Sequence, residues 1–109
     1  MPDDDKKQAA FQALVDRILT GDGQAAPQQR RQAFGNEGLG PPLDALIATI
    51  AASPAQVTDA EFAAARAAGC TEDQLFELVV CAAVGRSSRL YDAGLAALAE
   101  ATGGPDHAA

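Results

Sequence analysis

The sequence predicts an all-α fold of four to six helices in a single domain. Its 109 residues suit one domain and leave little room for two. Apolar residues recur at helical intervals, and no stretch alternates in the manner of a strand. Alanine supplies 26 residues, whereas the large aliphatic residues and phenylalanine together supply only 22. Closely packed helices suit this composition better than a β-sandwich, because strands favour branched and aromatic side chains.

The first predicted helix follows a charged lead-in, residues 1–8, which we expect to be disordered. Phe11, Leu14 and Ile18 then mark the apolar face of an amphipathic helix. The glycine-rich sequence Thr20–Gly23 is expected to end it.

The segment 21–42 is rich in Gln, Gly and Pro. Because long loops without structure are uncommon in compact domains, we expect a short helical turn at residues 28–34. The adjacent Arg30 and Arg31 of this turn are expected to cover a solvated face rather than to bind an anion.

A further amphipathic helix is predicted to begin at Leu43, with Pro42 suited to its first turn. It should end at Ser53–Pro54, because proline disfavours helical geometry in the residue before it.

A helical hairpin is the clearest local prediction. Residues 57–62 combine a capping box, in which Thr and Glu satisfy each other's backbone N–H groups, with apolar residues at both ends of the box. The helix that follows should end at Gly69, a suitable left-handed residue. Residues 70–75 repeat the same box with Gln in place of Glu, so a second helix should begin directly after the short connection at Gly69.

The last helix changes character along its length. From Leu75 to Val84 its only charged residue is Glu77, so we expect this part to be buried on most sides, centrally or against a neighbouring subunit. The polar sequence Gly85–Arg89 indicates either a kink or a change of exposure. Helical spacing continues to about residue 101, and residues 102–109 are expected to form a disordered tail.

Two cysteines are the first candidates for chemistry. A reactive thiol needs a lowered pKa, but Glu77 lies one helical turn from Cys81 and should raise the pKa of that thiol. Cys81 is therefore predicted to be a small buried residue, and Cys70 to face the core beside Leu75. A disulfide between the two is excluded if the helix is regular, because they lie too far apart along it.

The remaining candidates are polar. Arg86, Arg89, Tyr91 and Asp92 form a cluster that is expected to hold a helix end or a subunit contact rather than to bind an anion. The single histidine, His107, lies in the predicted tail, where no general base could be positioned. No metal-ligand spacing and no cofactor motif are present.

Charge argues against several partners. The net charge of −7 repels nucleic acid and anionic membranes, and no apolar run is long enough to span a bilayer. A helix-turn-helix spacing through Ala65, Gly69 and Leu75 offers DNA binding as a remote alternative, but its second helix begins with carboxylates. The N-terminal residues differ from a secretory signal, so we expect a cytoplasmic protein.

One segment resembles a known family. Residues 57–62 read VTDAEF and residues 66–80 read RAAGCTEDQLFELVV. This pattern is similar to the C-terminal portion of the carboxymuconolactone decarboxylase / alkylhydroperoxidase D-like superfamily. There the motif vT-x-x-x-[FV]…R-x-A-G-x-[ST]-[DE]-x-x-[IL] precedes an apolar helix and a polar turn containing Arg, here Gly85–Leu90. The resemblance covers about residues 40–100.

The resemblance implies an all-helical, homo-oligomeric protein, a trimer or hexamer. Peroxidase members of the family carry Cys-x-x-Cys and a histidine, and the decarboxylase branch uses a histidine; this chain has no counterpart before position 107. Our first hypothesis is therefore a non-catalytic oligomer, or a partner subunit of a complete family member, without a cofactor.

The alternative hypothesis is an enzyme of the peroxidase or decarboxylase type with a non-standard site. A peroxidase would use Cys70 or Cys81. A lyase would combine carboxylates such as Glu77 with Arg86 or Arg89 in a pocket between subunits.

Overall fold

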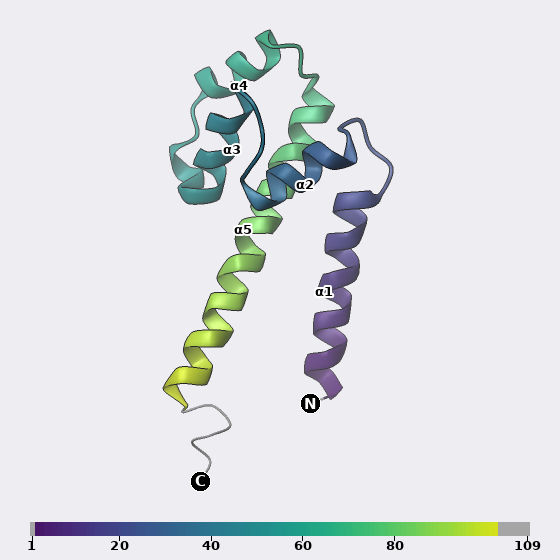
Figure 1. The fold of residues 1–109 in the computed structure, drawn as a ribbon, viewed down its shortest axis with the longest axis vertical. Helices are drawn as coiled ribbons and strands as arrows, with labels where there is room; N and C mark the ends of the chain where they lie inside the picture. Colours follow the sequence, from purple (N-terminus) through teal and green to yellow (C-terminus); the bar gives the residue numbers. More distant parts are fainter. Residues whose placement is uncertain (1, 103–109) are drawn as a thin grey trace.

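The computed structural model describes residues 2–102, and the side chains of residues 5–102. This part of the chain is all-helical, as predicted, with five α-helices and one short 3-10 helix (Figure 1). In order, these are α1 (Pro2–Thr20), α2 (Pro27–Gly35), α3 (Leu43–Ala52), the 3-10 helix η1 (Pro54–Gln56), α4 (Asp59–Ala67) and α5 (Glu72–Ala101). The expected turn at residues 28–34 is α2.

The molecule consists of a packed region and two projecting helical segments. The helices α2, α3 and α4 gather around the N-terminal half of α5, and the C-terminal end of α1 lies beside them (Figure 1). We refer to residues 15–85 as the head and to residues 2–14 and 86–101 as the arms. The arms lengthen the described part of the chain to 59 × 28 × 21 Å, with a radius of gyration of 16.7 Å against about 13 Å for a compact domain of about this size.

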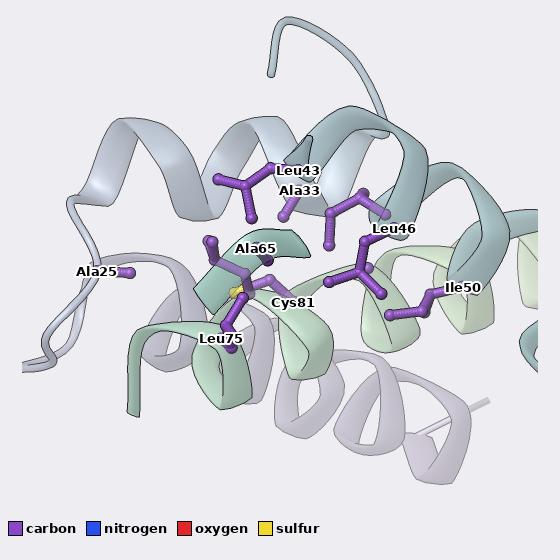
Figure 2. Packing of buried hydrophobic residues seen from close by; sticks show 11 residues of the cluster. Ala25, Ala33, Leu43, Leu46, Ile50, Ala65, Leu75 and Cys81 are labelled. Carbon is purple, nitrogen blue, oxygen red and sulfur yellow. The ribbon is translucent and has the colours of Figure 1, made fainter. Parts of the chain in front are cut away.

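The core lies in the head and depends on small residues. Leu46, Ile47, Leu78 and Cys81 are its largest fully buried side chains (Figure 2 shows Leu46 and Cys81). The helices approach closely through buried alanines (Ala33, Ala65 and Ala82). At the crossing of α2 and α5, a Cβ on Gly85 would lie against the backbone carbonyl of Phe34, so only glycine permits this approach.

Both predicted capping boxes are present. The Thr58 hydroxyl accepts from the Glu61 N–H at 3.3 Å, and the Thr71 hydroxyl accepts from the Gln74 N–H at 3.1 Å. Gly69 adopts the left-handed conformation with a φ of 107°, as predicted. The hairpin of α4 and α5 is therefore defined by local sequence.

One expectation needs correction. Residues 2–8 are the first turns of α1 and not a disordered lead-in. Of the two alternatives for residues 85–89, the change of exposure is found, because α5 is continuous through them and none of its residues beyond Gly85 is buried. Residues 103–109, including His107, lie outside the described residues, and Thr102 is the C-cap of α5.

The segment Leu75–Val84 is exposed on one face only. Leu75, Leu78 and Cys81 lie in the core, whereas Phe76 is 70% exposed and Ala83 beside it is also exposed. The other residues of the segment are buried or partly buried, so the prediction of burial on most sides is confirmed, with one open face on α5. No helix among residues 2–102 is long and apolar enough to cross a membrane.

Candidate functional site

The cysteine candidates occupy different environments. Cys81 is fully buried, as predicted, and its Sγ lies 3.9 Å from the carbonyl oxygen of Ile18. Burial raises the pKa of the Cys81 thiol to about 11; the charge of Arg30 opposes this rise and that of Glu77 adds to it. Cys70 is half-buried and packs against the core. Both thiols are free, as expected.

Glu77 closes the connection between α1 and α2. Its carboxylate accepts hydrogen bonds from the backbone N–H groups of Gln24 at 2.7 Å and Ala25 at 2.5 Å. A Cβ on Gly23 would press against this carboxylate, so a larger residue there would shift the end of the Glu77 side chain. Glu77 therefore compensates backbone donors that the loop leaves unpaired at the approach to α2.

Three arginines each satisfy the end of a different helix. Arg30 donates from Nη1 to the carbonyls of Ile18 at 3.2 Å and Gly21 at 2.6 Å, at the end of α1. The last carbonyls of a helix lack partners within it and carry partial negative charge, so a guanidinium there is favourable. Arg30 is only 5% exposed, which contradicts the expectation of a solvated face, whereas Arg31 is exposed as expected.

The other two arginines belong to α5. Arg86 donates from Nη1 to the carbonyls of Ala51 at 2.6 Å and Ala52 at 2.9 Å, at the end of α3. Arg89 donates from Nη1 to the carbonyl of Phe34 at 2.7 Å, at the end of α2. The prediction that the polar cluster holds a helix end is confirmed for Arg86 and Arg89, and its second part, a subunit contact, stays a prediction.

The predicted polar cluster is not a single group. Arg86 and Arg89 reach toward the head, whereas Tyr91 and Asp92 line a groove between α5 and α1. The sequence could not show this, because it depends on which elements lie on either side of α5.

The groove separates the two arms. It has a volume of about 590 Å³, and apolar residues of both helices line it, with Phe11 of α1 and Tyr91 of α5 in contact at a ring-centroid distance of 6.2 Å. Leu95 also lines the groove. Its remaining lining is polar and comes from both helices (Lys7, Gln8, Gln12, Ser87, Ser88 and Asp92).

A second feature that the sequence analysis missed is the number of exposed large apolar side chains. Six are exposed, five of them on α5 (Leu14, Phe76, Leu90, Tyr91, Leu95 and Leu98). Their helical spacing was visible in the sequence, but the sequence did not show that the head ends at Gly85. No residue of α5 beyond Gly85 is buried.

The chemistry of the described residues is chiefly structural. Glu77, Arg86 and Arg89 are all bound to backbone groups of neighbouring elements. Among the side chains that the structure describes, those of residues 5–102, no group of three or more His, Cys, Asp or Glu could hold a metal ion.

Comparison with known proteins returned no significant match to a family model, a curated protein or a solved structure. The resemblance of residues 40–100 to the carboxymuconolactone decarboxylase / alkylhydroperoxidase D-like superfamily therefore stays a prediction.

Proposed function

We propose that the protein is a non-catalytic subunit of a helical homo-oligomer that associates through its arms and the outer face of α5. The observation that carries this proposal is the exposure of six large apolar side chains on α1 and α5. Single exposed apolar residues are common on soluble proteins, but several close together are typical of an interaction surface. Four of the six lie close together in sequence on the exposed half of α5 (Leu90, Tyr91, Leu95 and Leu98).

The arms also lack internal support. Residues 86–101 form about four helical turns with no buried residue, and isolated helices of this length are marginal in water. Covering Leu90, Leu95 and Leu98 with another helix would remove apolar area from water at about 25 cal/mol per Å². Association would therefore stabilise the α5 arm, which has no buried residue within a single chain.

The environment of the candidate catalytic residues supports a non-catalytic role. Thiol peroxidase chemistry requires a thiolate, and a pKa of about 11 keeps Cys81 protonated at neutral pH. Lyase chemistry would require Glu77 and Arg86 to meet a substrate, but each already binds backbone groups of the head.

Sedimentation equilibrium at micromolar concentrations tests the proposal. We expect a mass that is a multiple of the 11.1 kDa chain and that decreases on dilution. A well-folded species of 11.1 kDa throughout this concentration range would contradict it.

A further inference from the structure

The outer face of α5 carries a seam of uncharged residues that is apolar except for Ser87. Eight residues recur at alternating intervals of four and three from Phe76 to Ala101, which is the spacing of positions that face a partner helix in a coiled coil. The seam extends over about 38 Å at a rise of 1.5 Å per residue. Its members are uncharged (Phe76, Val80, Ala83, Ser87, Leu90, Gly94, Ala97 and Ala101).

The seam faces away from the head. At 3.6 residues per turn it lies on the opposite side of α5 from Leu78 and Gly85, which are buried against the head. Seven of its residues are exposed and Val80 is partly buried. A Cβ on Gly94 would meet no atom within 4 Å, so the space beside this position is open.

The order of residue sizes along the seam is complementary to the same order reversed. When two copies of α5 run antiparallel, every layer sets a larger residue against a smaller one. The layers are Phe76 with Ala101, Val80 with Ala97, Ala83 with Gly94, and Leu90 with Ser87, each occurring twice. A parallel pair would set Phe76 against Phe76 and Gly94 against Gly94. The first layer would then be too crowded and the second would leave an unfilled gap between the helices.

From this complementarity we infer that a second copy of the chain covers the seam, with the two α5 helices antiparallel about a two-fold axis between Ser88 and Arg89. The inference rests on the proposed oligomer and names its interface. Such an interface is self-complementary, because each contact is repeated by symmetry. It is compatible with a dimer, or with a hexamer that contains two-fold axes, but not with an isolated trimer.

Charge agrees with the same register. The recesses on either side of Phe76 contain Arg66, beside Glu72, and Arg17, beside Asp22. Neither arginine side chain makes a hydrogen bond or ion pair with another described residue. The antiparallel register places the C-terminal end of the second copy's α5 beside these two recesses, and that helix end carries a partial negative charge.

One ion pair follows from this register. Glu100 of the second copy lies on the same side of the seam as Val79, and Val79 lines the recess that contains Arg66. In antiparallel coiled coils, flanking positions on the same side of the two helices face each other, which brings Arg66 of one copy toward Glu100 of the other.

The matched variants Ala97→Arg and Ala96→Arg test the surface. Both residues are exposed on the same arm, but only Ala97 belongs to the seam. We expect Ala97→Arg to weaken self-association in sedimentation experiments by at least about ten-fold in Kd, and Ala96→Arg to leave it unchanged. Circular dichroism should report equal helix content for both, at a concentration where both are dissociated.

A charge exchange tests the register. Arg66→Glu and Glu100→Arg should each weaken association, and the double variant should recover it, because the pair is reversed but retained. If the wild type assembles but Ala97→Arg assembles equally well, or if the double variant is weaker than either single one, the inferred interface is overturned and the proposed oligomer stands. If the wild type is a folded monomer, the proposed function itself fails.

Discussion

The head and the arms use the same residue types in opposite ways. In the head, apolar side chains point inward and Arg30 satisfies the end of α1, while Arg86 and Arg89 reach from the first turn of the α5 arm to the ends of α3 and α2. In the arms, leucines face solvent, and the two helices contact each other through Phe11 and Tyr91 in an otherwise open groove. Because α5 belongs to both regions, it shows that one continuous helix can be a core element over its first half and largely exposed over its second.

The largest expected difference concerns two leucines of α5. Leu78 is 1% exposed in the head, and Leu98 is 59% exposed on the arm. Leu78→Ala should lower the free energy of unfolding by about 2–5 kcal/mol, because it removes buried contacts and leaves a cavity. Leu98→Ala should change it by less than about 0.5 kcal/mol in the dissociated chain.

Urea titration measures both changes in the free energy of unfolding, at a protein concentration below that at which the chain associates. Equal losses for Leu78→Ala and Leu98→Ala would show that the arm is already packed within one chain, and the contrast between the two regions would disappear. At higher concentrations Leu98→Ala should become more destabilising, because association then contributes to stability.

The sequence predicted the head better than it predicted the arms. Capping boxes, the left-handed Gly69 and the proline at residue 54 act locally, so the hairpin and the end of α3 followed from neighbouring residues. The burial of Arg30 did not, because it depends on carbonyls of α1 that lie 9 and 12 residues away along the chain.

The candidate functional residues also divide into those whose environment follows from neighbouring residues and those whose environment depends on distant parts of the chain. Burial of Cys81 was predictable, since Glu77 one turn away and an apolar surrounding oppose a reactive thiol. The separate roles of Arg86 and Tyr91 were not, because they depend on which helices lie on either side of α5. The exposure of Phe76 depended on the same long-range arrangement.

The two cysteines of the head should differ in thiol reactivity, because Cys81 is fully buried and Cys70 is half-buried. Raising the pKa of Cys81 from 9.0 to about 11 lowers its thiolate fraction by about 100-fold at neutral pH, and burial restricts access further. We expect iodoacetamide to modify the half-buried Cys70 first, and Cys81 only as the chain unfolds.

Mass spectrometry of timed samples measures the two rates, and Cys70→Ser isolates the slower one. The unfolded chain in urea supplies the reference rate. Modification of Cys81 in the folded protein at the reference rate would contradict the closed interior and would reopen a peroxidase role.

The smallest expected effect is the response to acid. In the head, the Glu61 carboxylate accepts hydrogen bonds from the hydroxyl of Thr49 at 2.8 Å and from the backbone N–H of Thr58 at 3.1 Å. Thr49 and then Thr58 lower the pKa of Glu61 below its ordinary value of 4.5. A lowered pKa stabilises the folded state above pH 4.5, and this stabilisation is lost as pH falls through the folded pKa.

The matched variants are Glu61→Gln in the head and Glu100→Gln on the arm. Glu61→Gln should lower Tm at neutral pH and flatten the fall in Tm between neutral and acid conditions, because this carboxylate no longer takes up a proton on unfolding. Glu100→Gln should leave that profile parallel to the wild type below the concentration of association. The curves are measured by circular dichroism, and parallel profiles for Glu61→Gln and wild type would mean that the contact between α3 and α4 does not depend on the charge of Glu61.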